Sequence, residues 1–140
     1  MIKMKSGYED PTVSAYWESL SGDDGHPYKS YVVDPVMFKM LGSLKQKIVV
    51  DLGCGNGYLG PQFIRKGAKQ VYLMDISKPN LEFARNRNNN KKVTFIHQDA
   101  TRKWKIKDRS VDIVFSDMML NEIENIKKPF KLDYQAVVLK

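Results

Sequence analysis

The apolar residues of this chain fall into short runs separated by longer amphipathic segments. Four runs have the length and apolar content of buried strands, at residues 48–51, 70–74, 93–97 and 111–116. Helical spacing or helix boundary signals mark residues 12–20, 27–41, 58–66, 78–88 and 126–138. Because strand and helix alternate from the first strand onward, the pattern predicts an α/β fold: a parallel sheet with right-handed crossovers, binding its ligand at the carboxyl ends of the strands.

The two helices expected before the first strand carry their own boundary signals. Asp10 followed by Pro11 is typical of a helix N-terminus, and Gly42 is typical of a helix end. Pro35 is expected to bend the second helix. The apolar residues of that helix form a roughly helical stripe, which consists of Tyr28, Val32, Val33, Val36, Met37, Met40 and Leu41.

A glycine-rich turn follows the first apolar run. Gly53, Gly55 and Gly57 allow the backbone positive φ angles and a close approach to a ligand that a Cβ atom would obstruct. Helix-compatible sequence comes next, so the turn is typical of a strand that delivers a nucleotide-like ligand to a helix N-terminus. An ordinary strand-to-helix turn is the alternative, but such a turn requires only one glycine.

Asp51, which opens this turn, helps to choose between ligands. Residues 55–60 also match the G-x-G-x-x-G pattern of dinucleotide sites, a weak signal when it stands alone. A carboxylate beside a bound pyrophosphate costs up to about 4 kcal/mol at ~4 Å and an effective dielectric constant of ~20. S-adenosylmethionine carries an ammonium and a sulfonium but no phosphate, so Asp51 favours it over NAD. An NAD(P)-type oxidoreductase fragment remains the alternative.

Two further strand ends carry acidic residues. Asp75 ends the second run, where a carboxylate accepts hydrogen bonds from both ribose hydroxyls in either cofactor class; a helix cap or a surface position is the alternative. After the third run, Asp99 is placed to accept the adenine amino group and the Ala100 N–H to donate to a ring nitrogen. The spacing of these residues after Asp51 favours an adenosine site.

The chain resembles the class I S-adenosylmethionine-dependent methyltransferases in residues 50–57, 74–77, 98–100 and 111–121, which match the family's cofactor motifs in order. The resemblance spans residues 8–138 and implies a Rossmann-like sheet between helices in three α/β/α layers. It implies that the glycines face the methionine part of the cofactor, Asp75 the ribose and Asp99 the adenine, and that Ser116 lies near the methionine ammonium through its backbone. The expected cofactor residues are Asp51, Gly53, Cys54, Gly55, Gly57, Asp75, Ile76, Asp99, Ala100 and Ser116.

The chain departs from the seven-stranded family sheet after its fourth strand. Only one further helical stretch is expected, so strands five to seven are predicted to be missing and the sheet to be incomplete. An open fourth strand exposes unpaired N–H and C=O groups, which predicts either self-association or coverage by another chain. The activity of the 140 residues alone is therefore in doubt, while the cofactor prediction is unaffected.

Composition fits one domain, with a helical cap or lid at 1–45 and a cofactor-binding core at 46–140. No secretory signal or membrane span is expected, which places the chain in the cytoplasm. Cys54, the single cysteine, excludes an internal disulfide and a cysteine-based zinc cluster, and no metal is expected. The net charge of +7 is compatible with nucleic acid, but a solvated basic surface is the favoured interpretation.

The acceptor is the least constrained part of the prediction. After the fourth strand the chain lacks the Asn/Asp-Pro-Pro-aromatic sequence of amino-group methyltransferases that act on adenine or glutamine, so a small-molecule acceptor is favoured. A non-catalytic partner subunit is the remaining alternative. Candidate substrate-side or lid residues are Tyr16, Trp17, His26, Tyr28, Tyr31 and Asn121, although His26 also suits a helix cap.

Overall fold

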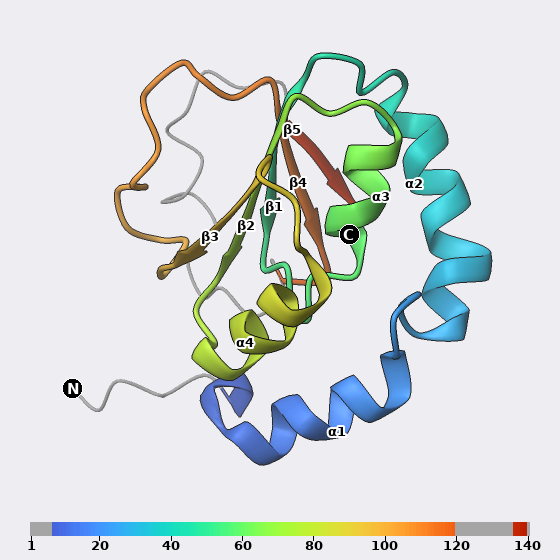
Figure 1. The fold of residues 1–140 in the computed structure, drawn as a ribbon, viewed down its shortest axis with the longest axis vertical. Coiled ribbons are helices and arrows are strands. Elements are labelled where there is room, and N and C mark those ends of the chain that lie inside the picture. Colours follow the sequence, from blue (N-terminus) through green and yellow to red (C-terminus); the bar gives the residue numbers. More distant parts are fainter. Residues whose placement is uncertain (1–6, 120–135, 140) are drawn as a thin grey trace.

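A computed structural model describes residues 7–119 and 136–139, and its centre is a five-stranded sheet in the order β3-β2-β1-β4-β5 (Figure 1). The strands are β1 (Ile48–Leu52), β2 (Gln70–Asp75), β3 (Val93–His97), β4 (Ile113–Asp117) and β5 (Ala136–Leu139). Every neighbouring pair is parallel, which confirms the predicted α/β architecture. The carboxyl ends of the strands therefore lie at one edge of the sheet, toward the end of the molecule that carries α1.

The helices begin and end close to the predicted residues. They are η1 (Gly7–Glu9), α1 (Pro11–Ser21), η2 (Lys29–Val33), α2 (Asp34–Leu41), α3 (Leu59–Arg65) and α4 (Lys78–Arg87). Asp10 caps α1 by accepting a hydrogen bond from the Thr12 N–H at 2.8 Å, and Ser77 caps α4 through the Asn80 N–H. Because short polar side chains satisfy the first free N–H groups, these caps were readable in the sequence.

The bend expected at Pro35 takes the form of a π-helical turn. Element η2 is this turn, and the Asp34 N–H closes it on the Lys29 carbonyl oxygen. Pro35 has no N–H to donate, so the regular α-helical ladder is interrupted just before it. The apolar stripe of this region splits into two faces: Met37 and Leu41 are buried, whereas Tyr28, Val32, Val36 and Met40 are each more than half exposed.

Two apolar clusters cover the two faces of the sheet. On one face, residues of α2, α3 and α4 pack on the strands, and Phe63 of α3 stacks edge-on against Phe115 of β4 at 5.7 Å. On the other face, Trp104 and Ile106 from the connection between β3 and β4 pack on strand residues such as Val50. Within the described residues, the helices that pack on the sheet lie on one face, and the second covering layer is an irregular segment rather than a helix.

The end of the chain differs from the sequence prediction. Residues 136–139 form β5, parallel to β4, although 126–138 had been predicted helical; β-branched Val137 and Val138 suit a strand. The rest of that predicted helix lies outside the described residues. The expectation of an open fourth strand is therefore wrong, because β5 pairs with β4 and the outer strands of the described sheet are β3 and β5.

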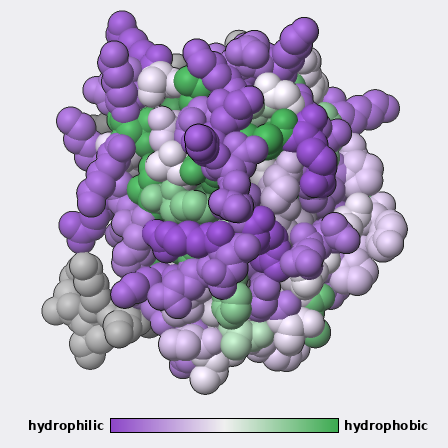
Figure 2. All heavy atoms as spheres, viewed as in Figure 1, coloured by the Kyte–Doolittle hydropathy of each residue, from purple (hydrophilic) through white to green (hydrophobic). Residues whose placement is uncertain are grey.

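Long hydrophilic side chains cover most of the face seen in Figure 2, with smaller apolar patches between them. The basic residues between β3 and β4, including Lys103, Lys105 and Lys107, are exposed, in agreement with a solvated surface. Arg87, at the end of α4, differs from these basic residues, because only 8% of its side chain is exposed. No helix among residues 7–119 is long and apolar enough for a membrane span, and no three potential metal-ligand side chains gather there.

Candidate cofactor site

The glycine turn between β1 and α3 has the backbone geometry that the sequence predicted. Gly53, Gly55 and Gly57 have φ angles of 75°, 54° and 70°. A Cβ atom added at Gly55 would meet nothing within 4 Å, whereas one at Gly57 would lie 2.7 Å from the Ala84 Cβ and one at Gly53 would overlap the Met119 side chain. Gly55 therefore faces open space, and Gly57 is required for packing against α4.

Asp75 links the turn to the end of β2. Its two carboxylate oxygens accept hydrogen bonds from the Gly55 N–H at 2.8 Å and from the Ser77 N–H at 2.7 Å. Burial raises the pKa of this carboxyl, and the hydrogen bonds from Ser77 and Gly55 oppose that shift. Each oxygen keeps a second lone pair, so the fixed carboxylate can also accept hydrogen bonds from a ligand.

Asp51 lies at the centre of an acidic group without a hydrogen-bond donor of its own among the described residues. The residue is 3% exposed, and burial raises its pKa to about 8, with Asp117 the next cause. The ammonium of Lys29, 2.7 Å from the Asp117 carboxylate, acts in the opposite direction. A buried carboxylate without a donor is costly, and a positively charged ligand group would relieve that cost.

The end of β3 places Asp99 in a turn that Asp99 itself stabilises. One carboxylate oxygen accepts hydrogen bonds from the backbone and side chain of Thr101, and the other lies 3.5 Å from the Arg102 Nε. Burial raises the pKa of Asp99, but these hydrogen bonds and the Arg102 charge outweigh it, so the net shift is downward. The Ala100 carbonyl oxygen accepts a hydrogen bond from the Trp104 indole at 2.9 Å.

Three other residues predicted for the cofactor site, Ser116, Cys54 and Ile76, have surroundings that differ from one another. The Ser116 hydroxyl donates to the Leu52 carbonyl oxygen at 3.1 Å, so this side chain ties β4 to β1. Cys54 is buried, and burial raises the pKa of its thiol, as expected for a packed residue rather than a nucleophile. Ile76 is 37% exposed beside Asp75 and presents an apolar surface at the carboxyl edge.

The candidate lid residues do not gather into a closed site. Tyr16, Trp17, Tyr28 and Tyr31 are all largely exposed, and Tyr31 reaches 84%. The His26 ring accepts a hydrogen bond from the Tyr28 N–H at 3.2 Å when its Nδ1 is unprotonated, as expected for the helix-cap alternative. Asn121 lies outside the described residues.

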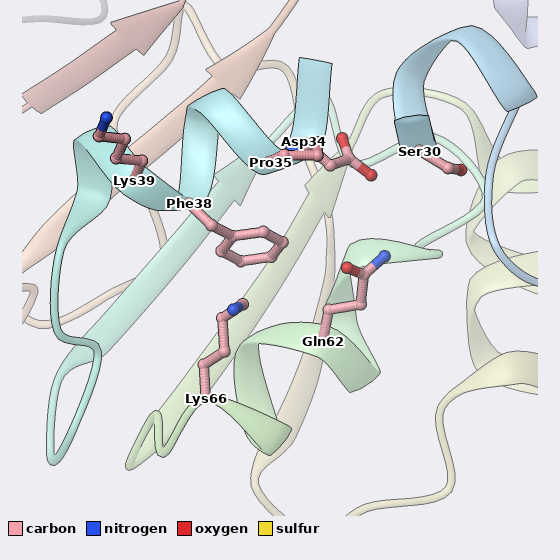
Figure 3. A pocket seen from close by; sticks show the side chains of 7 residues that line it. All are labelled: Ser30, Asp34, Pro35, Phe38, Lys39, Gln62 and Lys66. Carbon is pink, nitrogen blue, oxygen red and sulfur yellow. The ribbon is translucent and has the colours of Figure 1, made fainter. Parts of the chain in front are cut away.

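A hollow of about 500 Å³ lies between α2 and α3, apart from the predicted cofactor residues (Figure 3). One oxygen of Asp34 accepts a hydrogen bond from the Tyr58 hydroxyl at 3.0 Å, and burial raises the pKa of both groups. At the other end of the hollow, the Lys66 Nζ lies 4.3 Å from the centre of the Phe38 ring. The full lining is Ser30, Asp34, Pro35, Phe38, Lys39, Gln62 and Lys66.

The sequence prediction missed the charged partners supplied by other elements. Lys29 and Asp117 are separated by 88 positions, so neither residue signalled the other. Asp34 was not singled out in the sequence, where only the next residue, Pro35, was expected to shape the helix. The available signal was weak: Asp117 directly follows the predicted fourth strand, where side chains of a parallel sheet reach the ligand edge.

The geometry defines a Rossmann-like nucleotide-binding domain with an acidic site at the ends of β1, β2 and β4. Comparison with known proteins identifies its family. The profile of the methyltransferase domain family matches residues 49–137, more than half of the chain. The chain therefore belongs to the methyltransferase domain family, and its fold is that of the class I S-adenosylmethionine-dependent enzymes.

Individual relatives agree with this assignment. Ribosomal protein L11 methyltransferase from Psychrobacter cryohalolentis is 38% identical over 66 residues, which cover 44% of this chain and 21% of the relative. An S-adenosylmethionine-dependent methyltransferase from Mesorhizobium loti has a TM-score of 0.66 and 28% identity, covering 78% of this chain and 47% of that one.

A third relative is the magnesium protoporphyrin IX methyltransferase from Synechocystis PCC 6803, solved with bound S-adenosylhomocysteine. Its TM-score is 0.61 and its identity 25%, covering 80% of this chain and 56% of that one. The chain thus spans about a fifth of the matched L11 enzyme and about half of each solved structure.

Proposed function

We propose that this protein binds S-adenosylmethionine at the carboxyl edge of its sheet and transfers the sulfonium methyl to a small-molecule acceptor. The observation that carries the proposal is the pairing of Gly55 with Asp75. The glycine offers open space at the turn, and the buried carboxylate holds the turn in place while keeping lone pairs for a ligand. Both features fit the ribose and methionine ends of this cofactor.

The charged groups around Asp51 fit the methionine end. In the proposal, Asp51 and Asp117 attract the ammonium of the cofactor, and Lys29 attracts its carboxylate; the 2.7 Å ion pair between Lys29 and Asp117 already brings both signs together. A bound ammonium would favour the charged form of Asp51, whereas a pyrophosphate would gain nothing from this acidic group, which argues against the dinucleotide alternative.

At the adenosine end, Asp75 is assigned to the ribose, and Asp99 with Ala100 to the adenine. Ile76 supplies an apolar surface for the base, since it is partly exposed beside Asp75. The bonds from Thr101 fix the orientation of Asp99, so its carboxylate is held in position before the ligand arrives.

The bound cofactor supplies an activated methyl group on a positively charged sulfur. The residues of this chain therefore have to hold that group in line with an acceptor and exclude water, and orientation alone supplies several kcal/mol of rate acceleration. No described side chain is assigned as a general base. The magnesium protoporphyrin IX methyltransferase is named for a small molecule and supports a small-molecule acceptor, whereas the L11 relatives are named for a ribosomal protein. The cytoplasmic location stays a prediction.

Calorimetric titration with S-adenosylhomocysteine tests the site through Asp75→Asn. This variant keeps the shape of the side chain but loses its charge and one of the two oxygens that accept from Gly55 and Ser77, and we expect an affinity loss of about 1.5 to 3 kcal/mol, roughly 10- to 150-fold. Asp108→Asn is the matched control, because Asp108 is exposed in the connection before β4. Equal affinity in the two variants would overturn the ribose assignment, and S-adenosylhomocysteine formation with a panel of small acceptors then tests the transfer itself.

A further inference from the structure

Arg87, at the end of α4, is a buried cation that joins three segments distant in sequence. Its guanidinium donates to the Glu18 carboxylate of α1 at 2.7 Å, to the Gly22 carbonyl oxygen at 2.9 Å and to the Asn56 carbonyl oxygen at 2.8 Å. Asp23 adds a weaker contact at 3.3 Å. An exposed arginine on a helix end needs no such partners, so the burial of this one indicates a defined structural task.

Asn56 is the residue between the second and third glycines of the cofactor turn. Its carbonyl oxygen accepts from Arg87, and its side-chain amide donates to Glu18 at 2.6 Å. Glu18 therefore contacts the turn directly and also through Arg87. These three residues, Glu18, Asn56 and Arg87, are called the loop brace below.

The brace works together with two other supports of the same turn. The Asn88 amide donates to the Gly57 carbonyl oxygen at 3.0 Å, and Asp75 accepts from the Gly55 N–H. Consecutive residues 55, 56 and 57 are thus each held by a side chain from outside the turn. Glycine-rich backbone is otherwise free to sample many conformations, so these bonds select the one that is populated.

We propose that Arg87 and Glu18 are positioning residues for cofactor binding, acting through Asn56, and that α1 is a fixed support of the cofactor turn rather than a moving lid. Part of this inference rests on the proposed function, since it assigns the turn to the cofactor. The physical reason is that charge-assisted bonds inside a buried cluster are strong, and cofactor affinity depends on a turn already held in its binding geometry.

Hydrogen exchange of the amides of residues 55–58 tests the brace without any ligand. Arg87→Ala removes the guanidinium donors of the brace and leaves the Asn56 amide as its remaining donor, and Glu18→Gln, on a less buried side chain, keeps the shape of its carboxylate but removes its charge. We expect exchange at these amides to become about tenfold faster in both variants, and partial recovery in Arg87→Lys, which retains one charged donor. Arg85→Ala, on the same helix but over Phe95, is the charge control.

A second control separates the brace from general destabilisation. Val71→Ala shortens a fully buried side chain of β2 and lowers stability without touching the turn. If Val71→Ala speeds exchange at residues 55–58 as much as Glu18→Gln does, the brace is merely structural and the inference fails.

Titration with S-adenosylhomocysteine completes the test. We expect Glu18→Gln and Arg87→Lys to bind about tenfold more weakly than the unaltered protein and than Arg85→Ala. Unchanged affinity would overturn the positioning role. Absence of binding by the unaltered protein would refute the proposed function instead, while the exchange data would still decide whether the brace holds the turn.

Discussion

Aspartates at the strand ends act differently because their neighbours differ. Asp75 is buried but accepts two backbone N–H groups, so its charge is partly compensated. Asp51 is equally buried without such donors, and its pKa rises to about 8. Asp99 is more exposed and its pKa is lowered by bonds within its own turn. The electrostatic cost of the site is therefore concentrated at Asp51, next to the position assigned to the positive end of the cofactor.

Asp51→Asn is expected to stabilise the protein without ligand at neutral pH. A carboxyl with a folded-state pKa near 8 and an unfolded value near 3.9 keeps its proton in the folded state, so stability is highest at low pH and falls as the pH rises from about 4 to 8. The asparagine variant does not undergo this decrease in the free energy of unfolding, which amounts to about 1 to 4 kcal/mol.

Urea denaturation of both proteins at several pH values measures this difference. The unaltered protein should lose stability relative to Asp51→Asn between about pH 4 and 8, and the difference should level off above pH 8. A constant difference across that range would show that Asp51 titrates normally. Asp108→Asn controls for the removal of one carboxylate from the surface.

Two glycine substitutions are expected to separate stability from binding. In Gly55→Ala the new methyl group enters open space, so only the positive φ is costly, at about 1 kcal/mol, while the ligand position is obstructed. In Gly57→Ala the methyl group also collides with Ala84, which adds about 1 to 3 kcal/mol. Thermal melts and titration with S-adenosylhomocysteine should show weak binding with near-normal stability for the first variant only. The reverse order would contradict the assigned orientation of the turn.

At the scale of elements, the sequence was sufficient to predict helix ends, for which the signal is local. Asp10 and Gly42 marked helix ends correctly because caps act within a few residues. The strand β5 was missed because four residues of strand lay inside a longer helix-compatible stretch. The sequence also did not predict that the apolar stripe of α2 divides into a buried and an exposed face. Asp34 lies on the buried face with Met37, and hydrophobic periodicity alone does not reveal which face packs against the rest of the protein.

Element η2 is expected to respond to the cofactor. Lys29 of η2 pairs with Asp117 at the end of β4, so a ligand that engages this pair ties η2 to the sheet. Hydrogen exchange should slow in residues 26–33 when S-adenosylhomocysteine binds, with a smaller change in α1, which Arg87 already holds. Lys29→Met should abolish the slowing in η2. Protection of residues 53–57 alone would reject a role for η2 at the site.

At the scale of the whole molecule, the site depends on contacts that no local pattern reveals. The glycine turn and Asp75 were predicted because both stand in recognisable order along the chain. Glu18 and Arg87 are 69 positions apart, and the net positive charge was interpreted as a solvated basic surface although the Arg87 side chain is buried. Only the folded arrangement, in which α1 lies against α4 near the strand ends, brings them to the turn (Figure 1).

The central claim is that this acidic, glycine-lined edge is a site for S-adenosylmethionine. Its most direct test is calorimetric titration of the unaltered protein with S-adenosylhomocysteine and, separately, with NAD. The account predicts saturable one-site binding of S-adenosylhomocysteine and no measurable heat of binding with NAD, because the acidic group of Asp51, Asp75 and Asp117 favours a positively charged ligand group and disfavours a pyrophosphate. Binding of NAD in preference to S-adenosylhomocysteine, or of neither compound, would contradict it.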